Sequence, residues 1–416
     1  MSRQQTYVIV GAGLAGAKAA EALRGRGFDG RIVLVGEEPA RPYERPPLSK
    51  GYLTGEADTA SLFTHAETFY PEQTIDLRVS TTVTAIDPAD HTVTLGSGEL
   101  VHYDKALLTT GSAPRRLGGP GADLPGVHHL RTVADADALK AAAAQAHAAV
   151  VIGAGWIGSE VTASLRQGGL PVTLIEPAAV PLERVLGTEV GAIYRDLHAG
   201  HGVDLRMGDG VASLHGDGHV AQVRTTSGAR IDADLVVVGI GAQPRIGLAA
   251  EAGLKTGDGV STDEFLRTSH PDVYAAGDIA AAWHPLYGTH VRVEHWANAA
   301  DQGAAAGAIM LGADEPYTRI PYFFSDQYDL SMEYRGYCPD WDQVVLRGRP
   351  ADGAFLAFWL RDGAIRAALN ANDWDAGEHL HRLVQARARI AADQLADPGV
   401  ALDDLDPGSA TRKSAA

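Results

Sequence analysis

Cysteine is almost absent from this sequence, which has one, Cys338, in 416 residues. A single thiol forms no disulfide within the chain, no Cys-x-x-Cys redox pair and no cysteine-based metal site. Aromatic residues make up only 6% of the chain. No apolar run approaches the roughly twenty residues that a membrane-spanning helix needs. We therefore expect no internal disulfide, no bound metal and no membrane partner.

Basic residues are also few, with 35 lysines and arginines against 52 acidic residues and a net charge of −17. This balance disfavours nucleic acid or an anionic membrane as the main partner. Hydrophobic residues reach 45% and charged residues 21%, which is ordinary for a globular chain, and the length suggests two or three domains. No signal segment precedes the first expected strand, so we expect a cytoplasmic protein.

A glycine-rich motif stands near the start of the chain. Residues 7–10 are a short apolar run typical of a buried parallel strand, and residues 17–23 favour a helix. Between them Gly11, Gly13 and Gly16 form a G-x-G-x-x-G pattern. The first glycine allows a tight turn, the second lets a pyrophosphate approach the backbone, and the third lets helix and strand pack closely. The helix N-terminus adds free N–H groups for phosphates.

An acidic residue follows this motif at the expected distance. Residues 32–35 predict a second strand, and Glu37 lies about twenty residues past the last glycine, where a carboxylate binds ribose hydroxyls. Three prolines within residues 41–50 then exclude a regular helix or a central strand. We expect a rigid loop there that runs across the ligand.

The same pattern recurs 142 residues later, with Gly153 in the position of Gly11. Gly155 and Gly158 complete the second motif, and Glu176 is its acidic residue. A carboxylate there accepts hydrogen bonds from a 2′-hydroxyl and repels a 2′-phosphate, so we expect NAD rather than NADP. Two such motifs predict two dinucleotide sites.

Two crossings separate these nucleotide-binding units. The strands expected at 105–109 and 235–238 both lead into small residues and then proline, at 110–114 and 239–244. The chain therefore leaves the first unit near residue 114 and returns near residue 245. After the return, the Gly-Asp pair ending at Asp278 can place a carboxylate against a sugar hydroxyl.

The C-terminal region differs in character. Aromatic residues become frequent from Tyr317, and alternating segments predict strands at 343–347, 355–360 and 364–370. The Arg-Asp-Gly sequence at 361–363 predicts a hairpin turn. We expect one amphipathic helix over 378–395 and a disordered tail over 407–416.

Together these motifs resemble the FAD-dependent, NADH-using ferredoxin reductases of the putidaredoxin reductase type, which serve P450s and Rieske-type dioxygenases. The resemblance covers essentially the whole chain. The matching segments are Gly11-Ala-Gly-Leu-Ala-Gly16, Pro42-x-x-x-Pro46-Pro-Leu-Ser-Lys50, Gly153-Ala-Gly-Trp-Ile-Gly-Ser-Glu160, Tyr274-Ala-Ala-Gly-Asp278 and Ser325-Asp-Gln-Tyr328.

The resemblance implies an α/β fold of the glutathione reductase type, with two Rossmann-like domains and a small α+β C-terminal domain. It implies an FAD-binding domain at 1–114 and 245–320, an inserted NADH-binding domain at 115–244, and a ferredoxin-docking domain at 321–406.

The implied site residues fall into two sets. Those for FAD are Gly11, Gly13, Ala15, Gly16, Glu37, Arg45, Lys50, Val83, Arg131, Asp278 and Trp296. Those for NADH are Gly153, Gly155, Ile157, Gly158, Glu160, Glu176, Arg184 and Gly241. One departure from the family is Trp156, where similar reductases have Phe or Tyr, and a bulkier indole there would slow NADH entry.

The implied reaction is hydride transfer from NADH to the flavin, followed by two one-electron transfers to a [2Fe–2S] ferredoxin. We predict Lys50 and Glu160 as the catalytic residues and hypothesise that they form an ion pair beside the flavin. We also expect a monomer or weak dimer. Small ferredoxins are usually acidic, so we expect a local docking patch of arginines around the flavin edge, such as Arg292, Arg319 and Arg335.

Three alternatives remain open. An NADH oxidase or quinone reductase would work without a protein partner. A disulfide or peroxide reductase would need a redox cysteine near the flavin, where this chain has Ser49. A signalling flavoprotein of the apoptosis-inducing-factor type shares the Pro-Pro-Leu-Ser-Lys segment, but would have a long C-terminal insertion, basic stretches or a targeting segment.

Overall fold

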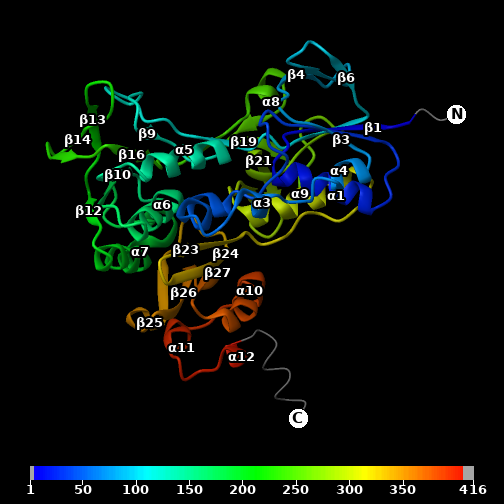
Figure 1. Ribbon diagram of the computed structural model, residues 1–416. Coiled ribbons are helices and arrows are strands. Elements are labelled where there is room, and N and C mark those ends of the chain that lie inside the picture. Colours follow the sequence, from blue (N-terminus) through cyan, green and yellow to red (C-terminus); the bar gives the residue numbers. More distant parts are fainter. Residues whose placement is uncertain (1–3, 406–416) are drawn as a thin grey trace. The chain divides into compact units, whose positions relative to one another are not determined.

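The computed structural model describes residues 4–405 (Figure 1). These residues form two compact units. The first unit comprises residues 4–46, 58–113 and 242–319, and the second comprises residues 47–57, 114–241 and 320–405. Two of the points at which the chain passes between the units lie at the short strands β8 (Ser112–Pro114) and β17 (Ala242–Pro244), close to the crossings expected near residues 114 and 245.

The first unit is built on a parallel sheet in the order β20-β7-β1-β2-β3. Its strands are β1 (Thr6–Val10), β2 (Arg31–Val35), β3 (Ile75–Arg78), β7 (Lys105–Leu108) and β20 (Val273–Ala275). The side chains of β1, β2, β7 and β20 are mostly buried on both faces of the sheet, which is why these strands are largely apolar runs. The edge strand β3 instead alternates apolar and charged residues and is only partly buried.

Two smaller sheets and several helices complete this unit. The antiparallel sheet is β4 (Val83–Asp87), β5 (Thr92–Leu95) and β6 (Leu100–His102). The other sheet is β18 (Thr256–Gly257), β19 (Gly259–Thr262), β21 (Ala280–His284) and β22 (Thr289–Val291). The helices are α1 (Leu14–Gly25), α3 (Thr59–Leu62), α4 (Phe69–Glu72), α8 (Gly247–Glu251), η2 (Gly277–Ile279) and α9 (Trp296–Met310).

Helices α1 and α9 lie side by side in Figure 1 and pack closely. Small residues make this possible, because a Cβ atom on Gly303 would lie 2.2 Å from the carbonyl oxygen of Ala15, and one on Gly307 would lie 2.7 Å from that of Ala19. This contact fixes the start of α1, and with it the glycine loop that precedes the helix.

The second unit repeats this plan. Its parallel sheet has the order β12-β11-β10-β16-β9, with β9 (Val127–His128), β10 (Ala149–Ile152), β11 (Val172–Glu176), β12 (Asp204–Met207) and β16 (Leu235–Val238). Its antiparallel sheet is β13 (Val211–His215), β14 (Gln222–Thr225) and β15 (Arg230–Asp232). Its helices are α2 (Gly51–Thr54), α5 (Val133–Ala143), α6 (Trp156–Gln167) and α7 (Glu183–Gly200). The short 3₁₀ helix η1 (Pro46–Ser49) leads into α2.

The C-terminal segment adds an antiparallel sheet in the order β23-β24-β27-β26-β25, gold to orange in Figure 1. Its strands are β23 (Tyr322–Gln327), β24 (Leu330–Gly336), β25 (Gln343–Arg349), β26 (Ala354–Arg361) and β27 (Ala364–Ala371). Its helices are α10 (Gly377–Gln385), α11 (Ala392–Ala396) and α12 (Leu402–Leu405), with 3₁₀ turns η3 (Pro350–Asp352) and η4 (Trp374–Ala376). The α/β fold with a C-terminal α+β region is as predicted.

Helix α7 explains why this sheet belongs to the second unit. Leu186, Val190 and Tyr194 of α7 are buried in one hydrophobic cluster with Phe323 and Trp359 of the sheet. The indole N–H of Trp359 also donates to the carbonyl oxygen of Leu186 at 3.2 Å. The first hairpin of the sheet, β23 and β24, was not predicted.

The single helix predicted over 378–395 is wrong. The structure has α10 and α11 instead, separated by residues 386–391. Arg387 has a left-handed φ of 46°, and the helix does not continue through it. The carbonyl oxygen of Ala388 then accepts the N–H of Ile365 in β27 at 3.0 Å. The turn predicted at 361–363 is confirmed, since Asp362 and Gly363 both have positive φ. The tail predicted to be disordered, 407–416, lies outside the described residues.

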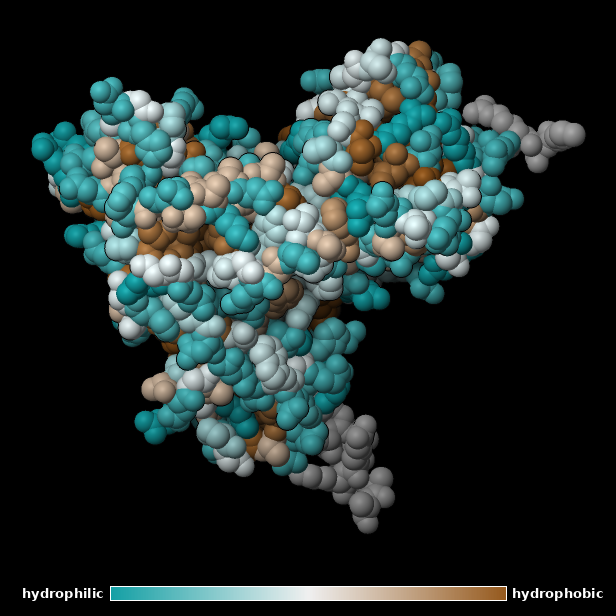
Figure 2. Space-filling model, viewed as in Figure 1, coloured by the Kyte–Doolittle hydropathy of each residue, from teal (hydrophilic) through white to brown (hydrophobic). Residues whose placement is uncertain are grey.

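The surface drawn in Figure 2 is mostly hydrophilic, with hydrophobic residues in small groups. Among residues 4–405, no helix is both long and apolar enough to cross a membrane.

Candidate functional site

The first glycine loop has two glycines that packing requires and one that it does not. Gly11 has φ +119°, and a Cβ atom there would lie 2.2 Å from the carbonyl oxygen of Thr109. A Cβ atom on Gly16 would lie 2.2 Å from the carbonyl oxygen of Gly11. A Cβ atom on Gly13 would meet no atom within 4 Å. The space at Gly13 is open, as it must be if a ligand is to approach the backbone.

The second glycine loop divides its roles in the same way. Gly153 has φ +95°, and its Cβ atom would lie 2.5 Å from the carbonyl oxygen of Gly239. A Cβ atom on Gly158 would lie 1.9 Å from the carbonyl oxygen of Gly153, whereas one on Gly155 would meet nothing within 4 Å. Each loop therefore keeps one open position at its middle glycine.

These middle glycines are also the N-caps of α1 and α6. Neither Gly13 nor Gly155 offers a side-chain cap, and neither helix has an acidic residue in its first turn. No side-chain oxygen at the cap therefore competes for the first N–H groups of either helix, and their positive end suits a phosphate. The residues present fit a dinucleotide pyrophosphate at both loops.

The two predicted ribose-binding acids follow their strands as expected, but each already has partners. Both carboxylate oxygens of Glu37 are bonded by the guanidinium of Arg245. Glu176 accepts the N–H groups of Ala154 at 2.7 Å and Ala178 at 3.1 Å. A carboxylate has about four acceptor positions, so each acid retains capacity for a sugar hydroxyl.

The remaining residues predicted for FAD in the first unit lie on several elements. Arg45 is ion-paired with Glu38 at 2.7 Å, and Asp278 accepts the hydroxyl of Ser112 at 2.8 Å. Trp296 begins α9 and is 36% exposed. Ala15 is buried in the first turn of α1, and Val83 begins β4.

The other predicted residues lie in the second unit. Arg131, assigned to FAD, precedes α5, and its backbone N–H donates to Asp135 at 3.1 Å. Ile157 is 44% exposed at the second glycine loop, and Arg184 is exposed in the first turn of α7. Gly241 has φ +101°. An exposed isoleucine here offers an apolar contact surface to a planar ring.

The predicted ion pair between Lys50 and Glu160 is present in the second unit. Its N–O distance is 2.8 Å, and the side chains are only 16% and 4% exposed. Residues 47–57 belong to this unit, which differs from the predicted boundaries that placed them in the first domain. They are anchored by Leu53 in the core and by Tyr52, whose hydroxyl donates to Asp137 at 2.6 Å.

Two serines that were not predicted as site residues complete the environment of Glu160. The hydroxyl of Ser49 donates to Oε2 at 2.5 Å, and that of Ser325 donates to Oε1 at 2.7 Å. Phe324 places its ring centroid 5.4 Å from the Lys50 ammonium. Ser325 and Gln327 lie with Phe323 on the buried face of β23, and buried polar groups need partners. Because β23 was not predicted, the sequence did not signal this role for Ser325.

Trp156, the departure from the family pattern, begins α6 and is partly buried. Its ring packs edge-on against Phe323, with centroids 4.7 Å apart. The indole therefore has a fixed packing partner on β23.

The arginine patch predicted for docking is wrong in two of its three members. Arg292 is 13% exposed and ion-paired with Asp258 and Glu294. Arg335 is 12% exposed and ion-paired with Glu333 at 2.8 Å. Only Arg319 is well exposed, at 69%, and it too pairs with an acid, Asp301. These guanidinium groups neutralise carboxylates within their own unit.

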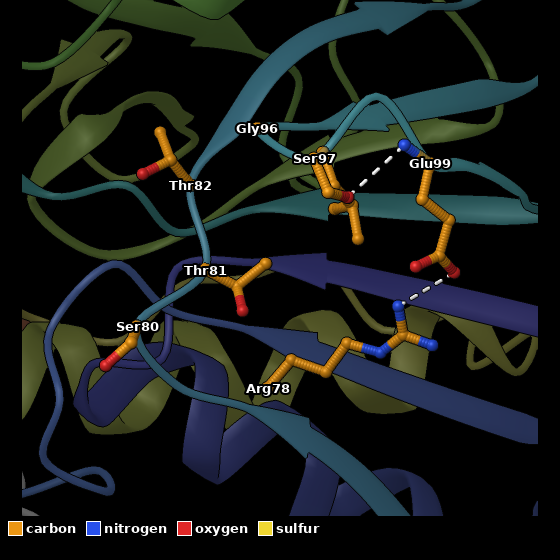
Figure 3. A pocket seen from close by; sticks show the side chains of 8 residues that line it. Arg78, Ser80, Thr81, Thr82, Gly96, Ser97 and Glu99 are labelled. Atoms are coloured by element: carbon orange, nitrogen blue, oxygen red, sulfur yellow. Dashed lines mark hydrogen bonds and ion pairs between the residues drawn. The ribbon is translucent and has the colours of Figure 1, made fainter.

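Three other features lie apart from the predicted site residues. The ligand atoms of His91, His270 and Asp272 lie within 4.8 Å of one another, so these residues could hold a metal ion. Two ligands of a tetrahedral zinc ion lie about 3.4 Å apart, so a zinc ion would need the more distant atoms of this group to come closer. An open hollow of about 310 Å³ lies along residues 78–82 and 95–99, with Arg78 and Glu99 ion-paired at its edge (Figure 3). No predicted site residue lines this hollow. Burial raises the pKa of the Cys338 thiol to about 11, so it stays protonated and unreactive.

Comparison with known proteins agrees with this arrangement. Residues 5–303 match the pyridine nucleotide-disulphide oxidoreductase family, and residues 322–405 match the reductase C-terminal family. The chain is 41% identical over 398 residues to the anthranilate 1,2-dioxygenase system ferredoxin–NAD(+) reductase component of Burkholderia cepacia, covering 95% of this chain and 98% of that protein.

Two solved structures are also similar. The ferredoxin reductase for the CYP199A2 system from Rhodopseudomonas palustris has a TM-score of 0.93 at 34% identity, covering 99% of this chain and 100% of that one. The covalent putidaredoxin reductase–putidaredoxin complex has a TM-score of 0.92 at 35% identity, covering 96% and 98%. With two glycine loops of matching geometry and a family match over most of its length, this chain belongs to the pyridine nucleotide-disulphide oxidoreductase family.

Proposed function

We propose that this protein is a ferredoxin–NAD(+) reductase that uses bound FAD to pass electrons from NADH to a ferredoxin. The observation that carries the proposal is the buried Lys50–Glu160 ion pair, which joins the Pro-Pro-Leu-Ser-Lys segment to the helix of the second glycine loop. The similar proteins described above are ferredoxin reductases by name, and the match extends over nearly the whole chain.

Each cofactor has a set of residues to hold it. Backbone N–H groups at the start of α1 would bind the FAD pyrophosphate, with Glu37 and Asp278 near sugar hydroxyls and Trp296 as a ring contact. The start of α6 would bind the NADH pyrophosphate, and Glu176 would accept ribose hydroxyls. The family binds FAD and NAD(H), and the two open glycine positions support one dinucleotide at each loop.

FAD, when bound, accepts two electrons as a hydride and releases them one at a time to a one-electron acceptor. Lys50 supplies a positive charge that would favour the negative charge gained on reduction. Glu160 holds this ammonium in place, and its own charge is compensated by Lys50 and by hydroxyls of Ser49 and Ser325. The protein therefore needs no nucleophile, and its contribution is alignment and charge.

The acceptor we propose is a [2Fe–2S] ferredoxin that serves a P450 or a Rieske-type oxygenase, in the cytoplasm, with the reductase as a monomer or weak dimer. A dithiol mechanism is incompatible with one buried cysteine. An NADH oxidase or quinone reductase remains the alternative, and its distinguishing property is rapid turnover without a protein acceptor.

The experiment is a titration of the purified protein, followed by visible absorption. We expect a yellow protein whose flavin band is bleached by one equivalent of NADH and much more slowly by NADPH. Addition of a [2Fe–2S] ferredoxin should then restore the band under anaerobic conditions. A protein without flavin, or a flavin that NADH does not bleach, would contradict the proposal. Fast reoxidation by oxygen or quinone, with none by ferredoxin, would favour the alternative.

A further inference from the structure

A chain of hydrogen bonds connects helix α7 to Glu160. Ser325 donates to Glu160 at 2.7 Å, the amide nitrogen of Gln327 donates to Ser325 at 3.3 Å, and Gln327 Oε1 lies 3.0 Å from His198 Nε2. The other ring nitrogen of His198, Nδ1, lies 3.3 Å from the hydroxyl of Tyr328. Glu160, Ser325, Gln327 and His198 are all at most 4% exposed, so these bonds lie in the interior.

The chemistry of the groups gives the chain one direction. An ionised carboxylate only accepts hydrogen bonds, so Ser325 must donate to Glu160. Gln327 donates its N–H to Ser325 and therefore presents its carbonyl oxygen to His198, which must carry its proton on Nε2. Nδ1 is then an acceptor for the hydroxyl of Tyr328. Every donor in the chain points toward the carboxylate of Glu160.

This direction is consistent with a neutral histidine. Burial lowers the pKa of His198 to about 4, so it carries one ring proton at neutral pH. Aligned hydrogen bonds polarise one another in a medium of low dielectric constant. The charge of Glu160 and the tautomer of His198 therefore stabilise each other.

We propose that Ser325, Gln327 and His198 are positioning residues, which keep the carboxylate of Glu160 oriented so that it holds the Lys50 ammonium in place. The expected effect on electron transfer rests on the proposed function. The expected effect on Glu160 rests only on the hydrogen bonds described above. This positioning gives the C-terminal sheet a role in the reaction with NADH, because β23 contributes two of the three residues.

The test is a double-mutant cycle on the FAD-loaded full-length protein. Ser325→Ala and Gln327→Met would be made in the native sequence and in Glu160→Gln. In the native sequence we expect each to slow reduction of the flavin by NADH at least fivefold. In the Glu160→Gln background the same changes should alter the rate less than twofold, because the group they act on no longer carries a charge. Ser325→Thr, which keeps the hydroxyl, should restore the rate to within twofold of the native protein.

A second readout does not depend on activity. In urea unfolding, the shift in midpoint for Ser325→Ala with Glu160→Gln should be clearly smaller than the sum of the single shifts.

Tyr194→Phe is a matched control one helical turn from His198 in α7: its buried hydroxyl has no hydrogen-bond partner among the described residues, so its loss should leave the flavin reduction rate unchanged.

Equal slowing in both backgrounds, or additive shifts in the urea midpoint, would overturn the proposal. If NADH fails to bleach the native protein, the proposed function is wrong, yet the unfolding cycle still measures the coupling between Ser325 and Glu160. The two failures are therefore distinguishable.

Discussion

Glu160 is a buried carboxylate with one charged partner and two hydroxyl donors. Removing the partner of a buried charge usually costs more than an exposed ion pair contributes, because the remaining charge loses its compensation. At 4% exposure, Glu160 has little access to water. The stability of this site and its chemistry therefore depend on the same few contacts.

Substitution of Lys50 tests both properties. Lys50→Met should lower the free energy of unfolding by about 3 kcal/mol, since it removes the ammonium partner of a buried carboxylate. It should also slow flavin reduction by NADH at least tenfold, measured by stopped-flow absorption. Lys140→Met is the control: this exposed lysine bonds the carbonyl oxygen of Tyr52 at 3.3 Å in the same unit, and its loss should change stability by less than about 1 kcal/mol. An unchanged rate in Lys50→Met would remove the role assigned to Lys50.

The pH dependence of stability tests the neutral state of His198. Its pKa is about 4 in the folded protein, against 6.5 ordinarily. The unfolded chain therefore takes up the proton at higher pH than the folded protein does. The stability from the neutral ring is complete above pH 6.5 and is lost as pH falls from 6.5 to 4, by about 3 kcal/mol in total. His198→Gln should remove this part of the pH dependence, as measured by urea unfolding across pH 4 to 7.5. An identical pH dependence in the variant would contradict a depressed pKa.

Among the elements, the two glycine loops perform the same task with the same geometry. In each, the outer glycines are required by contact with the protein's own backbone, whereas the middle glycine faces open space. In each loop, two glycines are therefore needed for folding, and the middle glycine is left for ligand binding.

The second loop offers a direct comparison. Gly155→Ala should leave the melting temperature within about 2 °C, because φ is −74° and no atom lies within 4 Å of the added Cβ. It should raise the KM for NADH at least tenfold, since the methyl group would meet the pyrophosphate. Gly158→Ala should instead lower stability by several kcal/mol, because its Cβ would lie 1.9 Å from the carbonyl oxygen of Gly153. Equal thermal stability of the two variants would show that the loop does not divide its roles in this way.

For the whole molecule, the net charge of −17 governs long-range encounter with a partner. Two of the three arginines expected to form a positive patch are largely buried beside carboxylates. Approach of an acidic ferredoxin is therefore repulsive at distances beyond the contact surface.

Ionic strength should reveal this repulsion. The second-order rate constant for reduction of an acidic ferredoxin should rise from low salt to about 0.1 M, where the Debye length is about 10 Å. Ferricyanide, also an anion, should show a smaller rise, because it carries less charge than an acidic ferredoxin and is therefore repelled less. A rate that falls steadily with added salt would instead indicate an attractive local patch formed by other basic residues.

Much of the fold could be read from short stretches of sequence. The apolar run at 7–10, the glycine spacings and the turn at 361–363 each constrain the backbone over a few residues, and the structure contains all of them. The break in the predicted C-terminal helix could not be read in this way, because amphipathic periodicity continues past Arg387 while the backbone turns to pair with β27.

The partners and exposure of charged side chains could not be read from short stretches of sequence. The pairing of Lys50 with Glu160 could be anticipated from two motifs, but Ser49, Ser325, Gln327 and His198 could not be assigned to Glu160 before the fold was known. The same holds for Arg292 and Arg335, whose exposure was misjudged. Spacing along the chain sets local backbone geometry, so it could specify two nucleotide loops. Burial and hydrogen-bond partners depend on residues far apart in sequence, and only the packing of α6, α7 and β23 brings these together.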